Sequence, residues 1–306
     1  MKSVLQFDSI GSFHRYLNLP KAEHPLISLI DYSRIDYPDD SSEIRWVQGF
    51  YSIGLKRNVR EKFNYGHQPY DFDEGILSLV APQQVLRIEI NSQVQTEPSG
   101  WLLLIHPDFL WGTSLATTIK KYDFFGYAVN EALFLSEKEE HNMVEIFKNI
   151  QREYQSNVDK FSQKIVVSQI ELLLNYTERF YERQFITRKI TNHQVLNRLE
   201  EVLADYLNDD HLSQYGPPSV QKVADHLNLS PNYLSSLLKT LTGRSTQQHI
   251  RHQLVEKAKT KLSTTELSVS EIAYELGFEH PASFSKLFKN KVNISPIEFR
   301  QKYAPE

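Results

Sequence analysis

The chain has 306 residues, 40% of them hydrophobic and 24% charged, which is the composition of an ordinary globular protein of about two domains. It contains no cysteine, so disulfides, thiolate metal sites and a cysteine nucleophile are excluded. No basic segment followed by an apolar run opens the chain, and no apolar stretch approaches the roughly 18 residues that cross a bilayer. We therefore expect a cytoplasmic protein with no membrane partner.

The net charge of −4 hides a difference between the two ends of the chain. Residues 216–306 carry 12 Lys and Arg against 8 Asp and Glu, a balance of +4, whereas the first 215 residues carry −8. A basic end on an acidic body is typical of a chain in which one domain meets an anionic polymer. Taken alone, the same balance also fits an ordinary solvated surface.

The first part of the chain, to about residue 107, has the pattern of β structure. Short segments rich in Val, Ile, Leu and aromatic residues alternate there with turn clusters. The predicted strands are 46–56, 74–82, 84–90 and 100–107. Several short strands at this spacing predict an antiparallel sandwich or barrel.

Aromatic residues are dense in this region, which suggests either a ligand pocket or a well-filled core. The candidate pocket residues are Phe50, Tyr51, Tyr65, Tyr70, Phe72, Arg87, Trp101 and Trp111. Arg87 is included because it alternates with Leu86 and Ile88 and would meet an anionic ligand if it projects inward. An outward-facing strand position is the alternative for Arg87, and simple core filling is the alternative for the aromatic residues.

Two long helical patterns follow, over about 136–184. Ser136 opens the first with Glu139 three residues later, a capping box. The second pattern, over 160–183, carries an apolar stripe wide enough to face both its own domain and a second surface. The residues expected at a dimer contact are Phe161, Ile165, Leu172, Leu173, Tyr176 and Phe180. Packing on its own domain alone is the alternative.

A polar stretch at 188–192 interrupts the pattern and predicts a domain boundary. The expected domains are therefore 1–187 and 193–306. Closely spaced short helices with many caps, and no strand signal, predict that the second domain is made only of helices.

Two stretches of the second domain repeat one helical unit: SVQKVADHLNLSPNYLSSLLK from residue 219 and SVSEIAYELGFEHPASFSKLFK from residue 268. Apolar residues recur at i, i+3, i+4 and i+7 over each first helix, and Asn228 or Gly277 follows, residue types that accept a left-handed backbone. Ala224 and Ala273 sit midway and allow a second helix to cross closely. This is the arrangement of a helix-turn-helix, whose second helix enters the major groove of DNA.

The segment that joins the two copies, GRSTQQHIRHQLVEKAKTKLSTTEL, predicts one amphipathic helix that Ser245 and Gln248 open with a capping box. About 17 helical residues span roughly 25 Å. With the widths of the flanking units added, the two second helices would sit about 34 Å apart, one turn of B-DNA. One chain would then read two successive major grooves.

The second copy resembles a known family. The run from Ser268 to Phe278, the run from Ser283 to Lys289 and the segment SPIEFR at 295–300 resemble the signature of AraC/XylS-type bacterial transcription regulators. Asn293 stands where the family usually has Gly, and Leu238 where it usually has Phe. The resemblance covers roughly the last third of the chain closely. The first part is similar only in architecture to the cupin-like, ligand-sensing and dimerising domain of AraC-type proteins.

The resemblance implies an α+β multidomain fold, with an N-terminal cupin-like antiparallel β-barrel and trailing helices. A C-terminal all-α domain with two helix-turn-helix units joined by a linker helix would follow. The implied function is a sequence-specific transcription regulator, with activation as its expected mode, that responds to a small-molecule effector bound in the barrel. The expected partners are double-stranded promoter DNA, RNA polymerase, a second copy in a homodimer and an unknown small-molecule effector, with no cofactor.

Outward-facing positions of the two second helices match the base-facing positions of the family motif. The expected base-reading residues are Asn232, Ser235, Ser236, Pro281, Ala282, Ser283, Ser285 and Lys286. Only Asn232 can make an amide–adenine pair, and Lys286 is the one long donor for guanine. The residues expected to hold phosphates are Lys239, Arg244, Lys289 and Lys291.

An enzymatic first domain is the alternative from another class. A cupin-type barrel often holds a metal through a His-x-His pair and a Glu, and the nearest approach here is His67 with Glu74, with His106 as a third partner. The second His is missing, and no Ser/His/Asp elbow, phosphate loop or GxGxxG appears. We therefore predict no metal and no catalytic residue. A cupin-fold metal-dependent enzyme with a DNA-binding appendage, and an effector-independent regulator that senses a protein partner, are the alternatives.

Overall fold

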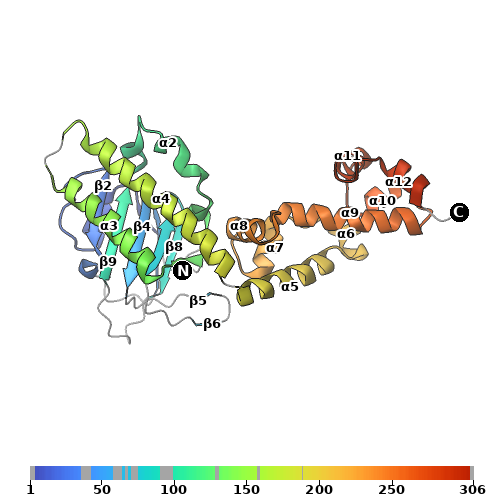
Figure 1. Cartoon of the computed structure of the whole chain (residues 1–306), viewed down its shortest axis with the longest axis horizontal. Coiled ribbons are helices and arrows are strands. Elements are labelled where there is room, and N and C mark those ends of the chain that lie inside the picture. The colour runs from blue at the N-terminus through green and yellow to red at the C-terminus, as the bar shows by residue number, and fades with distance from the viewer. Residues whose placement is uncertain are drawn as a thin grey trace. The chain divides into compact units, whose positions relative to one another are not determined.

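The structure, a computed structural model, divides into two compact units: an N-terminal unit, Met1–Gln184, and a C-terminal unit, Phe185–Glu306. It describes residues 4–35, 43–57, 64–65, 68–69, 75–89, 99–127, 131–156, 159–187 and 189–303. Within these residues every strand belongs to the N-terminal unit, and the C-terminal unit is helical (Figure 1). The α+β class predicted from the sequence is confirmed.

The N-terminal unit contains two packed sheets and a short hairpin. Its strands are β1 (Leu5–Phe7), β2 (Ile27–Asp31), β3 (Glu43–Gln48), β4 (Tyr51–Arg57), β5 (Asn64–Tyr65), β6 (Gln68–Pro69), β7 (Ile76–Val80), β8 (Val85–Glu89), β9 (Ser99–Ile105) and β10 (Leu133–Phe134). The larger sheet has the order β10-β7-β4-β9-β2, the smaller β1-β3-β8, and β5 pairs with β6. The two larger sheets share a core in which Trp46 and Leu86 of the smaller meet Ile30 and Leu104 of the larger.

One strand pair departs from the predicted antiparallel arrangement. β1 runs parallel to β3, with Leu5 opposite Trp46 and Phe7 opposite Gln48. A parallel pair needs a long connection, and the chain supplies one, because α1 (Ile10–Tyr16) and β2 lie between the two strands. The pairs within the larger sheet are antiparallel.

The segment 46–56, expected as one strand, is two strands in different sheets, so that prediction is wrong. The chain bends at Gly49, whose N–H donates to the Phe7 carbonyl at 2.8 Å, and passes from the smaller sheet to the larger. The buried Gln48 amide supports the bend by donating to the Phe50 carbonyl and the Ser52 hydroxyl, both at 2.9 Å. A buried polar group stays in place when its bonds are satisfied, as here. The strands β1, β2, β5, β6 and β10 were not predicted.

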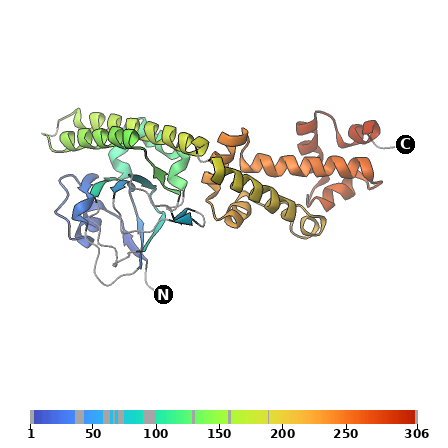
Figure 2. The same cartoon turned by 60° about the horizontal axis from the view of Figure 1, so that its bottom comes forward.

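Two long helices, α3 (Glu137–Tyr154) and α4 (Ser162–Thr187), lie side by side across the larger sheet (Figures 1 and 2). The capping box of Ser136 and Glu139 at the start of α3 is confirmed. Covered on both faces, the central strand β4 is buried from Tyr51 to Lys56. The remaining elements of this unit are short: η1 (Tyr32–Arg34), η2 (Pro107–Leu110), α2 (Leu115–Thr118), η3 (Ile119–Lys121) and η4 (Asp123–Gly126).

The C-terminal unit continues directly from α4. Its helices are α5 (Lys189–Tyr206), α6 (Asp209–Tyr215), α7 (Val220–Leu227), α8 (Pro231–Thr242), α9 (Thr246–Thr264), α10 (Val269–Glu275), α11 (Pro281–Val292) and α12 (Pro296–Tyr303). α5 begins at Lys189, so the stretch expected as a polar joint is helical over most of its length. One core, centred on α9 through Ile250, Leu254 and Leu262, joins these helices.

Candidate nucleic-acid interface

The first helix-turn-helix unit consists of α7 and α8. The Ser219 hydroxyl accepts the Lys222 N–H at 3.2 Å and opens α7. Asn228 closes α7 in the left-handed conformation (φ 56°), as its residue type predicted. Ser230 then accepts the Tyr233 N–H at 3.2 Å, so a capped helix α8 follows a tight turn.

The second unit, α10 and α11, repeats this local design. Ser268 and Glu271 form the predicted capping box, with bonds of 2.7 and 3.2 Å. The Ser268 N–H donates to the Glu271 carboxylate, and the Ser268 hydroxyl accepts the Glu271 N–H. Hydrogen bonding of the carboxylate to Ser268 holds the pKa of Glu271 below its usual value. Gly277 makes the turn with φ 76°, and Asn293 ends α11 with φ 66°, so the asparagine does what a glycine would do there.

The two second helices turn an apolar face inward, as predicted. On α8, Tyr233, Leu234, Leu237 and Leu238 are each at most 1% exposed. On α11, Phe284 and Phe288 are buried, and Leu287 packs partly against the same core. Both helices pack on α9, at its two ends (Figure 1). At about 1.5 Å per residue, the 19 residues of α9 separate these ends by roughly 28 Å.

The outward face of α8 is polar. Asn232 and Lys239 are exposed, whereas Ser235 and Ser236 are half-buried. The Ser235 hydroxyl lies 3.0 Å from the Thr246 hydroxyl in the first turn of α9. Ser235 therefore also joins α8 to α9, a role that the sequence pattern did not indicate.

On α11 the outward face is formed by a Pro-Ala start and by Lys286. Ala282, Ser283 and Lys286 are exposed, and Pro281 and Ser285 are half-buried. No described group forms an ion pair or hydrogen bond with the Lys286 ammonium. Lys286 is thus available to an external acceptor.

The predicted phosphate contacts Lys239, Arg244, Lys289 and Lys291 are all exposed. Arg244, which follows α8, and Lys291, near the end of α11, line one groove of about 340 Å³ along α9. The other lining residues are Gln248, His252, Val255, Glu256 and Lys259. The groove thus joins the two helix-turn-helix units with cationic and polar side chains, and it was not predicted from the sequence.

Three lysines of α9 have partners inside the unit. Lys257 donates to the Leu207 carbonyl at 2.5 Å, Lys259 pairs with Glu256 at 2.8 Å, and Lys261 pairs with Glu275 at 2.7 Å. The bonds of Lys257 and Lys261 attach α9 to neighbouring segments, and the two ion pairs partly neutralise the charges of Lys259 and Lys261.

One histidine beside the groove is set for the neutral form. Burial lowers the pKa of His249, and the nearby charges of Arg244 and His252 lower it further. Its Nε2 lies 2.8 Å from the Thr242 hydroxyl at the end of α8. His249 therefore acts as a polar brace between α8 and α9 and not as a phosphate-binding cation at neutral pH.

Known proteins share this C-terminal arrangement. A family described as a helix-turn-helix domain matches residues 223–302. The arabinose operon regulatory protein of Escherichia coli is 30% identical over 133 residues, which are 42% of this chain and 44% of that protein. The arabinose operon regulatory protein of Salmonella typhimurium is 33% identical over 100 residues, 33% of this chain and 34% of that protein.

Over these residues the chain is similar to transcription regulators of the AraC/XylS type. It spans only about a third to under a half of the length of these relatives. A solved structure, the DNA-binding domain of AdpA in complex with a target DNA, is 30% identical and covers 34% of this chain and 91% of that chain, with a TM-score of 0.30.

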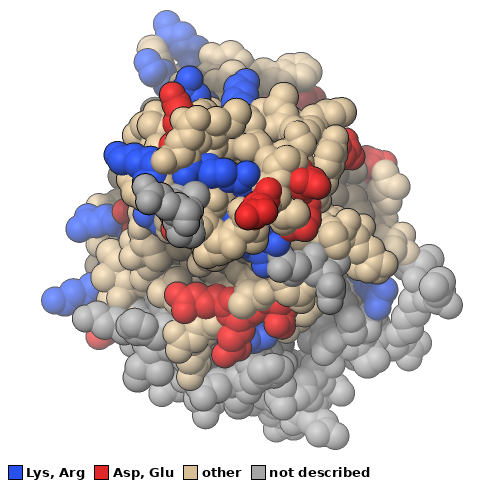
Figure 3. All heavy atoms as spheres, turned by 90° about the vertical axis from the view of Figure 1, so that its right-hand side faces the viewer, with Lys and Arg blue, Asp and Glu red and all other residues tan. Residues whose placement is uncertain are grey.

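Charges of opposite sign are unevenly distributed on the face that Figure 3 shows. Lys and Arg gather toward the left and upper part of the view, and Asp and Glu lie mainly toward its right and lower part. Segregated cationic side chains favour approach by an anionic partner from one side.

Among the predicted pocket residues whose side chains the structure describes, Phe50, Tyr51, Trp101 and Trp111 lie in different surroundings. Phe50 is fully buried against Phe13, with ring centroids 5.7 Å apart, and Tyr51 packs on Phe125 at 5.0 Å. Trp111 is 68% exposed, and only Trp101 lines a described cavity. The structure does not describe the remaining predicted residues fully. Tyr70 and Phe72 lie outside the described residues, and so do the side chains of Tyr65 and Arg87.

The predicted dimer residues divide between two faces of α4. Leu173 and Phe180 are buried within their own unit, at 0% and 5% exposure. Phe161, Ile165 and Leu172 are exposed, at 54%, 44% and 42%, on the solvent face; Tyr176 is half-buried. The wide apolar stripe predicted from the sequence therefore has two parts. One part packs inside the N-terminal unit, and the other is an exposed patch of three apolar side chains.

Metal and membrane sites were also considered. Within the described residues no group of three or more His, Asp or Glu is arranged to hold a metal ion. His106 instead accepts the Asp108 N–H at 3.3 Å and caps η2, while His67 and Glu74 lie outside the described residues. None of the described helices is both long and apolar enough to span a bilayer.

Proposed function

We propose that this chain is a sequence-specific DNA-binding transcription regulator whose two helix-turn-helix units read adjacent major grooves. The observation that carries the proposal is the placement of α8 and α11 at opposite ends of α9, each with a buried apolar face and an exposed polar face. A recognition helix needs an anchored inner face and outward polar side chains that meet base edges. Together with the width of the flanking helices, α9 sets a separation close to one helical turn of DNA, about 34 Å.

The two units offer different chemistry to the bases. Asn232 on α8 suits an adenine, through a bidentate amide contact, and Lys286 on α11 suits the O6 and N7 of guanine. Serines and the Pro-Ala start of α11 contribute weaker contacts. The site of one protomer is therefore asymmetric.

Backbone contacts supply affinity without sequence information. Arg244 and Lys291 in the α9 groove, with Lys239 and Lys289, are proposed to neutralise phosphates on the strand between the two grooves. Because few side chains in the reading set can make bidentate contacts, we expect modest affinity for one protomer and a need for two.

Replacing Lys286 by alanine should weaken binding to the cognate duplex by about 1–3 kcal/mol, roughly 5- to 150-fold, and leave binding to random duplex nearly unchanged. Lys289→Ala is the matched control, an exposed lysine three residues away on the same helix. It should weaken binding to both duplexes alike and reduce the slope of log K against log salt by about 1. Fluorescence anisotropy with both duplexes measures these differences. If Lys286→Ala lowers the affinity for both duplexes equally, Lys286 is not a base-reading residue.

The N-terminal unit is proposed to bind a second copy of the chain and to bind a small-molecule effector. Ile165 and Leu172 on α4 and Phe161 just before it form an exposed patch that supports a contact with a second copy, because such side chains are rarely left clustered in solvent. A ligand bound to this unit would shift the population of dimer geometries and so change promoter occupancy or contact with RNA polymerase. Activation is the proposed mode, and a cupin-like barrel is the proposed reading of its two facing sheets.

A further inference from the structure

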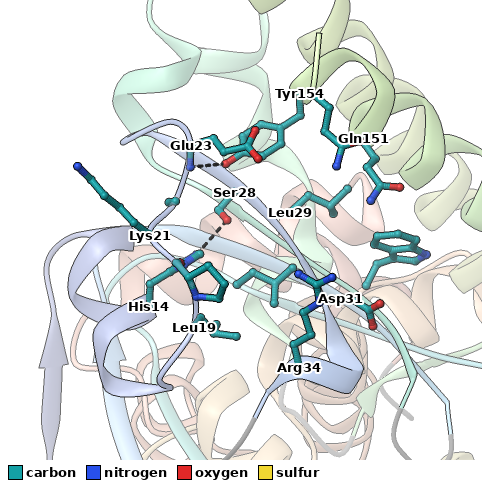
Figure 4. Close-up of a pocket in the computed structure, with 15 residues that line it drawn as sticks. His14, Leu19, Lys21, Glu23, Ser28, Leu29, Asp31, Arg34, Gln151 and Tyr154 are labelled. Atoms are coloured by element: carbon teal, nitrogen blue, oxygen red, sulfur yellow. Dashed lines mark hydrogen bonds between the residues drawn. The ribbon is translucent and has the colours of Figure 1, made fainter.

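A cavity opens at the edge of the larger sheet (Figure 4). It has a volume of about 180 Å³ and lies beside β2, the last strand of that sheet. Its walls come from the segment after α1, from η1 and from the end of α3. Since water occupies about 30 Å³ per molecule in the liquid, the space suits a ligand of roughly five to eight non-hydrogen atoms.

The floor of the cavity holds a fixed polar pair, His14 and Ser28. Both are buried, at 6% and 2% exposure. The His14 Nδ1 lies 2.6 Å from the Pro20 carbonyl, which can only accept, so Nδ1 carries the hydrogen. In neutral His14 the Nε2 then accepts from the Ser28 hydroxyl at 3.0 Å. The lone pairs of the Ser28 oxygen remain to accept from a ligand.

Tyr154 provides a donor in the upper wall. Its hydroxyl oxygen accepts the N–H groups of Glu23 and His24 at 3.0 and 3.3 Å, and this contact attaches the loop to the end of α3 (Figure 4). With its oxygen occupied in this way, the hydroxyl hydrogen is directed elsewhere and can serve a ligand.

The mouth contains donors that have no partner. Among the described residues, nothing hydrogen-bonds to or pairs with the Arg34 guanidinium, the Gln151 amide or the Trp101 indole N–H. Asp31 uses Oδ1 to accept from the Ser33 N–H and hydroxyl, at 3.0 and 2.7 Å, which leaves Oδ2 for another donor. Figure 4 shows the Arg34 guanidinium beside the Asp31 carboxylate at the mouth, whereas the Lys21 side chain extends away from it.

We propose that this cavity binds a small carboxylate that carries a hydroxyl or amino group on the neighbouring carbon. The planar guanidinium of Arg34 binds the carboxylate through paired hydrogen bonds. Asp31 accepts from the adjacent hydroxyl or amino group, because a cation and an anion side by side match that pair of substituents. Gln151 and Tyr154 donate to the remaining oxygens, and the Trp101 ring covers the carbon skeleton.

This proposal rests on the proposed function only in that ligand binding in the cavity would regulate DNA binding. A ligand held by Arg34 and Asp31 on one side and by Gln151 and Tyr154 on the other links the edge strand to the end of α3. α3 leads directly into α4, which carries the proposed dimer patch. Occupancy would therefore change how firmly the helix pair is held on the sheet.

The test is calorimetric titration of the full chain with glycolate, lactate, alanine and serine, and with the uncharged polyols glycerol and erythritol. At least one carboxylate should bind and the polyols should not. Arg34→Gln should weaken that binding at least 10-fold, since it removes the carboxylate partner. Lys21→Gln, the matched control, removes a charge at the rim that points away from the cavity and should change binding less than about 3-fold. Arg34 has no partner to lose among the residues that the structure describes, so circular dichroism should show both variants folded.

A flat titration with all four carboxylates, equal binding of polyols, or unchanged affinity in Arg34→Gln would overturn the assignment. DNA binding by the same preparations is measured in parallel. A chain that binds its DNA site but no carboxylate contradicts this site alone. A chain that binds a carboxylate but no specific duplex contradicts the proposed function and leaves the site standing.

Discussion

Gly277→Ala will cost the C-terminal unit about 3 kcal/mol or more of its free energy of unfolding. Gly277 has φ 76°, a conformation that side chains other than glycine disfavour. A Cβ added there would lie 2.5 Å from the Gly216 Cα and 2.7 Å from the Leu212 carbonyl oxygen. Both are backbone atoms, so α6 or the turn of the second helix-turn-helix must move.

The measurement uses the uneven distribution of tryptophan. All three, Trp46, Trp101 and Trp111, lie in the N-terminal unit, so urea titration followed by fluorescence reports that unit alone. Far-ultraviolet circular dichroism reports the helices of both units. We expect the Gly277→Ala transition to move to lower urea by dichroism while the fluorescence transition stays in place.

Asn228→Ala is the matched control for this substitution. Asn228 occupies the corresponding turn of the first helix-turn-helix with φ 56°, and its side chain is exposed. Alanine at this position introduces backbone strain of about 1 kcal/mol. Because the Asn228 side chain is exposed, the substitution creates no steric overlap like the one expected at Gly277. Equal losses for the two variants would show that close packing around Gly277 is not what requires glycine.

The double variant Ile165→Glu, Leu172→Glu will be monomeric at concentrations where the parent chain is a dimer. Placing two carboxylates in a desolvated contact should raise the dimer dissociation constant at least about 100-fold. Both side chains are exposed within their own unit, so its unfolding should not change. Sedimentation equilibrium measures the dissociation constant.

A control variant distinguishes the loss of the apolar patch from the effect of two added negative charges. His141→Glu and Asn142→Glu place two carboxylates on exposed positions of α3 and remove no apolar side chain. This variant should dimerise as the parent does. A dimer that survives in Ile165→Glu, Leu172→Glu would place the contact between copies away from α4.

Local chemistry explains why the C-terminal unit was predictable from the sequence. Two of its helices begin at the capping serines Ser219 and Ser268, and one ends at the left-handed Asn228. The buried faces of these helices follow a period of 3.6 residues. These signals act within one or two turns of the chain. The repeat also provides each of these signals twice, because the pattern at α7 and α8 recurs at α10 and α11.

The N-terminal unit was less predictable because its structure depends on contacts distant in sequence. No periodicity near Gly49 indicates that the chain changes sheets there, since the bend depends on the Phe7 carbonyl and on buried Gln48. The cavity at β2 likewise combines His14, Ser28 and Tyr154, which no spacing rule connects. Aromatic density pointed instead to Phe50 and Tyr51, which fill the core.

The central claim is that one chain reads two successive major grooves with α8 and α11. Hydroxyl-radical footprinting with methylation interference tests it most directly, on a duplex selected by the protein from a random pool. We predict two protected patches per protomer, on one face of the duplex and about 10 base pairs apart, each with its own interference at purine N7. The asymmetry of the two helices predicts different sequences in the two patches. A single protected patch per protomer, or uniform protection without base interference, would contradict the claim.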